Sequence, residues 1–204
     1  MTLLTDENAE KVAQAISQVE RDTDAELVTV LARQADDYHY ISALWAAAIA
    51  LLSPGLVLFT PFWLEQAEVL MIQVAVFVVF ATLFRIPWLL RRVIPGPVKR
   101  YRAGNLARRQ FLDNNLHHTA GETGVLIFVA ETERYVEIIA DRGISRFVDP
   151  TQWQTIVDEF TRQLHDGQVL AGFLGAVESC GSLLEKHVPA TRDKDELPNH
   201  LVIL

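Results

Sequence analysis

The sequence predicts an α/β fold, a small sheet covered by helices, which is interrupted by a two-helix transmembrane hairpin. Charged residues make up 22% of the chain, yet none occurs from Ile41 to Leu64 or from Val69 to Phe84. Outside these two runs, helical and strand-like patterns alternate, as they do in α/β domains. The apolar residues therefore divide the chain into a membrane part and a water-soluble part.

The first apolar run is long enough, at ~1.5 Å per residue, to cross a hydrocarbon core of ~30 Å as a helix. Ser53-Pro54-Gly55 in its middle marks a kink or a turn. We favour the kink, because transmembrane helices tolerate Pro and Gly. The second run is shorter and is extended past Arg85, whose long side chain can reach the interface. The predicted spans are 41–64 and 69–90, joined by Glu65–Glu68.

A basic segment follows the second apolar run, with eight Lys or Arg residues and no acidic residue between Arg85 and Leu112. By the positive-inside rule this flank faces the cytoplasm. A hairpin returns the chain to its starting side, so we predict a multi-pass protein of the inner (plasma) membrane with both termini in the cytoplasm. Nucleic acid is not an expected partner. Candidates for binding anionic membrane lipid are Arg91, Arg92, Lys99, Arg100 and Arg102.

The water-soluble part is predicted to be one domain in two pieces, residues 1–40 and 91–189. The first piece is too short to fold alone and contains a helix capped by Thr5 and a strand at Glu26–Leu31. The second piece contains a helix, two strands and two more helices. These elements are expected at 102–118, 125–129 and 135–140, then from Asp149 and from Leu170.

A C-terminal tail is expected at 190–204. It ends in Leu201–Leu204, an apolar group that can add to a sheet edge or dock in a groove, in this molecule or another; a frayed terminus is the alternative. Cys180 is the only cysteine, so no intramolecular disulfide forms. It lies in an apolar helical pattern and is predicted to be buried.

Two stretches of the second piece, Gly124–Ala130 and Arg134–Ile144, resemble the core strand pair of the TPM domain. Trp153 and Gly172–Glu178 extend the similarity along the two last helices, and Thr23–Val30 resembles the first strand. The resemblance implies an α/β sandwich. It implies no single function, because relatives include acid phosphatases of photosynthetic membranes and accessory proteins of membrane complexes or receptors. This chain differs from the usual member in carrying its membrane segments inside the domain.

Catalytic motifs are scarce, since the sequence contains neither a P-loop nor a G-x-S-x-G elbow. Asp141 and Arg142 follow a predicted strand, where sites in open sheets gather. Arg142 can meet an anion, and Asp141 or Glu26 can stand near a divalent cation; an ordinary turn with a local ion pair is the alternative. We therefore predict an interaction or assembly module at the membrane, with a protein partner or a second copy. The alternative is a weak metal-dependent phosphatase.

Overall fold

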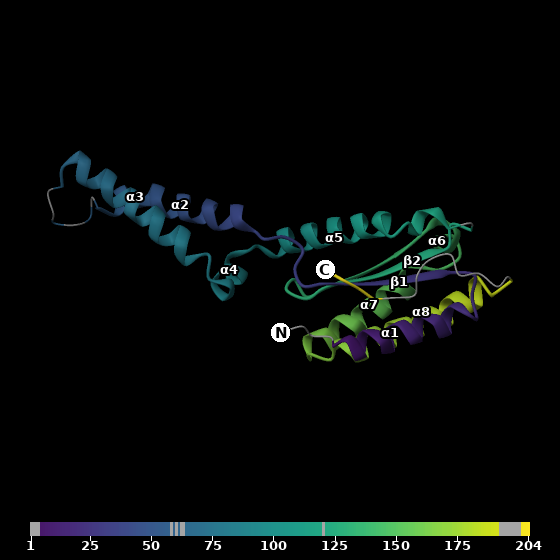
Figure 1. Cartoon of the computed structure of the whole chain (residues 1–204). Coiled ribbons are helices and arrows are strands. Elements are labelled where there is room, and N and C mark those ends of the chain that lie inside the picture. Colours follow the sequence, from purple (N-terminus) through teal and green to yellow (C-terminus); the bar gives the residue numbers. More distant parts are fainter. Residues whose placement is uncertain (1–4, 58, 60, 62–63, 120, 192–200) are drawn as a thin grey trace. The chain divides into compact units, whose positions relative to one another are not determined.

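The structure is a computed structural model, and it describes residues 5–57, 59, 61, 64–119, 121–191 and 201–204. The chain divides into two units (Figure 1). We call residues 1–35 with 100–204 the sheet unit, and residues 36–99 the hairpin unit.

The sheet unit is built on a four-stranded sheet in the order β3-β2-β1-β4. Strands β1 and β2 are parallel, with Glu26 opposite Gly124 and Ala32 opposite Ala130. β3 is antiparallel to β2, and β4 is parallel to β1. The bounds are Glu26–Ala32 for β1, Gly124–Ala130 for β2, Tyr135–Ala140 for β3 and Leu201–Ile203 for β4. The predicted mixed α/β fold is confirmed.

Helices cover both faces of this sheet (Figure 1). One face packs against α1 (Asp6–Glu20), α7 (Pro150–His165) and α8 (Val169–His187). The other face packs against α5 (Gly96–Asp113). Every residue of β1 and β2 is buried, because successive side chains enter opposite layers. The near-continuous apolar run of β2 is thus the pattern of a strand covered on both sides.

Side-chain caps explain where two of these helices begin. Thr5 accepts a hydrogen bond from the backbone N–H of Asn8 at 3.3 Å, and Asp149 accepts one from that of Thr151 at 2.8 Å. Pro150 occupies the first turn of α7, where a missing N–H costs no helical hydrogen bond. Both predicted starts are confirmed.

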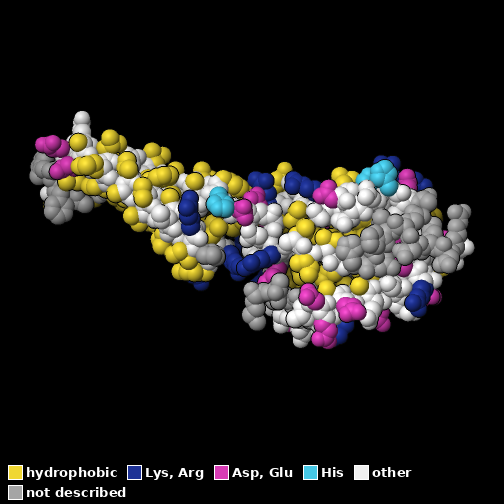
Figure 2. Space-filling view, viewed as in Figure 1, with side chains coloured by type: hydrophobic (Ala, Val, Ile, Leu, Met, Phe, Trp, Pro, Cys, Tyr) yellow, Lys and Arg dark blue, Asp and Glu magenta, His cyan; other side chains and the backbone are white. Residues whose placement is uncertain are grey.

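The hairpin unit contains α2 (His39–Val57), α3 (Gln66–Leu83) and the short α4 (Pro87–Val93). By length and composition, α2 and α3 can each span a membrane. Small residues form the buried face of α2, and small side chains let helix backbones approach closely. None of the 18 residues of α3 is buried. Hydrophobic side chains are spread along this unit on the face that Figure 2 shows. The small buried residues are Ser42, Ala46, Ala50 and Ser53.

The bounds of the helices in the hairpin unit differ from those of the predicted spans, which stay predictions as membrane segments. α2 continues through Pro54 but ends at Val57, before Leu64. Glu65 is the N-cap of α3, with a reciprocal capping box to Glu68, so Glu65–Glu68 begins a helix instead of linking two. The span 69–90 is not one helix. α3 ends at Leu83, because the residue before Pro87 is extended and proline supplies no N–H to continue the helical ladder.

Other differences concern the sheet unit. The helix expected at 102–118 begins at Gly96 and ends at Asp113. Asn115 then adopts a left-handed backbone conformation, with φ of 56°, which separates off a short 3-10 helix, η1 (Leu116–His118). A one-turn helix, α6 (Arg142–Ser145), follows β3 where no helix was predicted. The end of the tail forms β4, which pairs with β1. Of the alternatives considered for the tail, addition to a sheet edge of the same molecule is therefore the one observed.

Candidate functional site

The structure places the candidate residues Glu26 and Asp141 at the same end of the sheet. Glu26 lies opposite Gly124 in the register of β1 and β2. On the other side, the backbone N–H of Asp141 donates to the carbonyl oxygen of Gly124 at 2.9 Å. Because β1 and β2 both begin here, the carboxyl ends of the parallel strands lie at the opposite end of the sheet. Sites in open α/β sheets gather at those carboxyl ends, so that rule does not support a site at Asp141.

Asp141 and Arg142 form the start of a short helix. Asp141 is the N-cap of α6, and its carboxylate accepts a hydrogen bond from the backbone N–H of Arg142 at 2.7 Å. The Arg142 side chain is exposed, whereas Glu26 is only 3% exposed. The three candidates therefore share one end of the sheet, but they occupy different environments there.

Asp24, which the prediction of site residues missed, ties this end of the sheet to the segment after α8. Its carboxylate accepts hydrogen bonds from both the backbone N–H and the hydroxyl of Thr191, the former at 3.0 Å. Its backbone carbonyl accepts from the Thr123 hydroxyl at 3.0 Å. In the sequence, the only indication of a role for Asp24 is its place in Asp22-Thr23-Asp24, directly before a predicted strand. The contacts of Asp24 indicate a structural junction.

A divalent cation requires several oxygen ligands around one point. Within the ranges that the structure describes, no three or more His, Cys, Asp or Glu side chains come together in a way that could hold a metal ion. The described residues therefore do not fit a cation held by three such side chains. Glu26 and Asp141 stay predictions as cation ligands.

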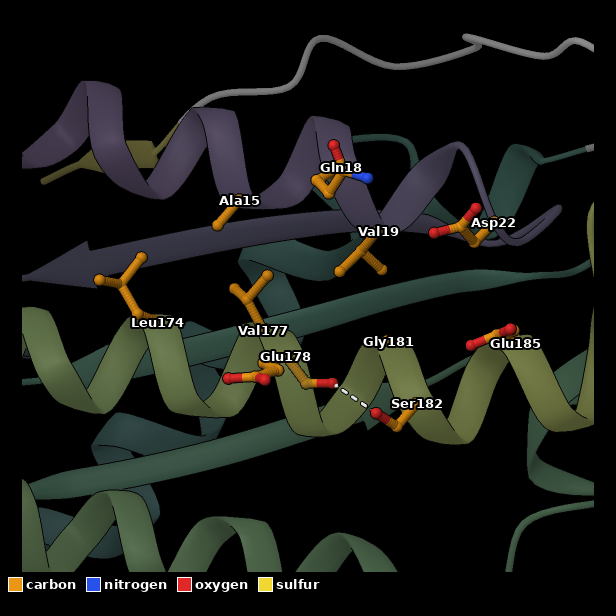
Figure 3. A pocket seen from close by; sticks show the side chains of 10 residues that line it. All are labelled: Ala15, Gln18, Val19, Asp22, Leu174, Val177, Glu178, Gly181, Ser182 and Glu185. Carbon is orange, nitrogen blue, oxygen red and sulfur yellow. Dashed lines mark hydrogen bonds between the residues drawn. The ribbon is translucent and has the colours of Figure 1, made fainter.

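A cleft of about 440 Å³ lies between α1 and α8 (Figure 3). Gly181 lets the helices approach closely: a Cβ atom there would stand 2.6 Å from Cγ2 of Val19. Carboxylates of Asp22, Glu178 and Glu185 line the cleft, and no Lys or Arg is among the described residues that line it. The Ser182 hydroxyl donates to the backbone carbonyl of Glu178 at 3.1 Å. The cleft thus favours a cationic group over an anionic one.

A larger groove, of about 760 Å³, follows the outer edge of β3 and is lined by all six β3 residues. α7 contributes Trp153 and Val157 to it, and α5 contributes Arg108. The Tyr135 hydroxyl donates to Oε2 of Glu137 at 2.9 Å. Burial, followed by the neighbouring Glu137 carboxylate, raises the pKa of Tyr135 to about 12. The phenol is therefore neutral and a hydrogen-bond donor at physiological pH.

The basic candidates lie on two helices. Arg91 and Arg92 are exposed on α4, and the Lys99 ammonium donates to the backbone carbonyl of Arg91 at 2.8 Å. On α5, Arg100 is exposed and Arg102 is partly buried. The exposed guanidinium groups are available to anionic lipid headgroups. The positions of the described residues do not define a more specific lipid-binding site.

Cys180 is fully buried in α8, as predicted, and burial raises the pKa of its thiol to about 12. A thiol must ionise to act as a nucleophile. Cys180 is therefore a core residue whose thiol stays protonated at physiological pH.

Comparison with known proteins identifies the domain. Residues 93–183 match the model of the TPM domain. The NMR structure of BA42 protein from the psychrophilic bacterium Bizionia argentinensis is similar, with a TM-score of 0.60 and 19% identity, over 98% of this chain and 94% of that one. At that identity the likeness concerns the fold alone. No curated protein matches the sequence. The resemblance carried by Gly124–Ala130 and Arg134–Ile144 is confirmed, and the chain contains a TPM domain.

Proposed function

We propose that α2 and α3 anchor this protein in a membrane and that its TPM domain binds a protein partner at the cytoplasmic face. The main support for a membrane anchor is the exposure of α3, none of whose residues is buried. Burying one large apolar side chain is worth about 1.5–3 kcal/mol. Lipid supplies that burial for the α3 side chains with large exposed fractions, namely Leu70, Met71, Val74, Val78 and Val79.

The polar side chains of α2 are compatible with a lipid environment. The Ser42 hydroxyl donates to the carbonyl of His39 at 2.7 Å, and the Ser53 hydroxyl donates to that of Ala50 at 2.8 Å. Hydrogen bonds within the helix remove the cost of placing a hydroxyl in hydrocarbon. The small residues on the buried face of α2 also suit helix packing in a membrane.

The basic flank supports the orientation. Arg85, Arg91 and Arg92 follow α3 directly, and no acidic residue occurs before Asp113. We therefore assign the TPM domain and both termini to the cytoplasmic side of the inner (plasma) membrane. Arg91 and Arg92 are the proposed contacts to anionic lipid, each worth ~1 kcal/mol near such a surface. Arg91→Gln with Arg92→Gln should reduce the phosphatidylglycerol that co-purifies with the protein, whereas Arg142→Gln with Arg146→Gln should not.

Labelling tests the orientation. A membrane-impermeant maleimide added to intact cells should label Glu65→Cys, which precedes α3, and should leave Ser182→Cys, in α8, unlabelled. Cys180 serves as the internal control, because a buried thiol with a raised pKa reacts only after unfolding. Labelling of Ser182→Cys but not Glu65→Cys would refute the orientation. Extraction of the protein by alkaline carbonate would refute the anchor.

The binding role is supported by the surfaces of the TPM domain. Its described residues present the α1–α8 cleft and the β3 groove, while its only thiol is buried. Crosslinking of the full-length protein in native membranes should trap it with another protein or with a second copy. Recovery of an uncrosslinked monomer under conditions that trap a known membrane complex would contradict the proposed function.

A further inference from the structure

The two edge strands of the described sheet differ in length: β4 has three residues and β3 has six. β4 adds to β1, with the backbone N–H of Leu204 donating to Leu31 and that of Arg33 donating to Leu204, at 2.9 and 3.0 Å. At the other edge, β2 is the only strand beside β3 among the residues that the structure describes. An open edge presents a row of backbone donors and acceptors to any strand that approaches it.

The hydrogen-bond pattern identifies which backbone groups face outward. Asp141 donates to Gly124, and antiparallel partners alternate between bonded and non-bonded pairs. Residues 139, 137 and 135 therefore pair with β2, and the backbone groups of Val136, Ile138 and Ala140 face away from it. The carbonyl of Ala140 accepts from the Ser145 hydroxyl at 2.9 Å. The open edge thus offers the N–H groups of all three residues and the carbonyls of Val136 and Ile138.

The groove beside β3 leaves room for a strand along this edge. It extends over the whole of β3 and has an apolar wall that includes Val148, Trp153 and Val157. Six residues of strand span ~20 Å at ~3.3 Å per residue. An added strand would therefore find hydrogen-bonding groups along its length and apolar side chains beside it.

β3 has few of the features that commonly protect an edge. It contains no Lys and no Pro, and its register with β2 has no bulge. Its one charged residue is Glu137, whose carboxylate accepts the Tyr135 hydroxyl. Val136, Ile138 and Ile139 are β-branched and favour strand pairing. The fold covers the edge of β1 and leaves that of β3 suited to pairing.

We infer that β3 pairs with β3 of a second copy, antiparallel and centred on Ile138, so that two TPM domains share one sheet. This inference rests on the proposed interaction function and names its partner and surface. Centring on Ile138 matches the outward-facing groups: Ile138 pairs with its counterpart, and Val136 pairs with Ala140. Symmetric pairing of this kind gives a closed dimer and leaves no unpaired β3 edge.

The negative charge of Glu137 favours a strand pair centred on Ile138 over one centred on Glu137. Centring on Glu137 would set two carboxylates directly opposite each other, which is destabilising in a sheet. Centring on Ile138 sets Glu137 opposite Ile139 and leaves the two carboxylates as diagonal neighbours, ~7–8 Å apart. The side chains of Glu137 and Arg108 both lie beside Gly104 in α5. A Cβ atom built at Gly104 would be 3.6 Å from Oε2 of Glu137 and 3.7 Å from Nη1 of Arg108. Each carboxylate thus enters the dimer with a cation nearby.

Two substitutions of Ile138 in the full-length protein test the pairing. Ile138→Pro removes the outward N–H and spares the bonds to β2, and Pro is tolerated on edge strands in that position. Ile138→Ala shortens the side chain and keeps the N–H. In nanodiscs, Ile138→Pro should weaken dimerisation about 30-fold relative to Ile138→Ala, because each copy loses one hydrogen-bond donor. Equal dimerisation of the two variants would overturn the inference.

A crosslink provides a second test that does not depend on proline being tolerated. The paired residues at the centre have Cα atoms ~5.5 Å apart, within the range of a disulfide. Mild oxidation in membranes should link Ile138→Cys into a dimer, and should not link Phe147→Cys, which is more exposed at 63%. Failure of both to link would overturn self-pairing. Photo-crosslinking from residue 138 to a different protein would overturn it too, but would leave the interaction function standing.

Discussion

Replacing Phe160 with alanine should lower the free energy of unfolding of the TPM domain by about 3–5 kcal/mol. Phe160 is 1% exposed, and its ring packs edge-on against Phe173 with centroids 4.9 Å apart. The ring also lies against Gly172, where a Cβ would stand 2.2 Å from Cε2 of Phe160. Removing the ring leaves a cavity between α7 and α8 that rigid neighbours close only in part. Urea unfolding of the full-length protein, followed by circular dichroism, measures the change.

Phe147→Ala is the matched control, since the same atoms are removed from a side chain that is 63% exposed. Its effect should stay within about 0.5 kcal/mol, as for most surface substitutions. Similar losses at the two positions would contradict the packing described for Phe160.

Gly124→Ala should destabilise the domain by about 3 kcal/mol, at the upper end of the usual cost of overpacking. A Cβ at Gly124 would stand 2.2 Å from the backbone oxygen of Leu116 and 3.0 Å from Leu116 Cβ. Leu116 is fully buried, so η1 cannot move aside freely. β2 cannot move easily either, because Glu26 and Asp141 flank Gly124 in the sheet. Thermal unfolding of the full-length variant measures the loss.

Gly175→Ala provides a control of opposite sign. Apart from the chain neighbours and the nearby backbone of α8 itself, no atom of the described residues lies within 4 Å of a Cβ added at Gly175, which is inside α8. Alanine in a helix interior is about 0.5–1 kcal/mol more favourable than glycine. Gly175→Ala should therefore raise the unfolding temperature. If Gly124→Ala also unfolds at or above the temperature of the unsubstituted protein, η1 must relax without cost.

Strongly patterned elements of the fold could be predicted from the sequence. The prediction for β3 matches its bounds, because Tyr135–Ala140 is rich in β-branched residues and follows a polar turn. The β2 run is equally clear, since burial on both faces requires apolar residues at successive positions. α6 has four residues, too few for helical periodicity to be detected. β4 has three, and its place depends on pairing with β1, which no local pattern specifies.

The surfaces were harder to predict than the elements. Glu26 and Asp141 lie at the same end of the sheet, on either side of β2, because β3 runs antiparallel to β2 and ends where β1 and β2 begin. The role of Asp141 as a helix cap followed from α6, which the sequence did not indicate. The α1–α8 cleft depends on Gly181 contacting Val19, residues far apart in the chain. Contacts of this kind are set by tertiary packing and leave little trace in periodicity.

The pairing of β1 with β2 has a consequence for biosynthesis. The seven residue pairs of these strands join segments between which α2 and α3 lie in the sequence. In the proposed membrane arrangement, the strands lie in one compartment when both helices insert and in different compartments when only one of them does. A chain in which one helix fails to insert leaves two apolar strands on opposite sides of the bilayer, unpaired and open to proteases. In that arrangement, pairing of β1 with β2 would distinguish chains with a complete hairpin from chains with a single inserted helix.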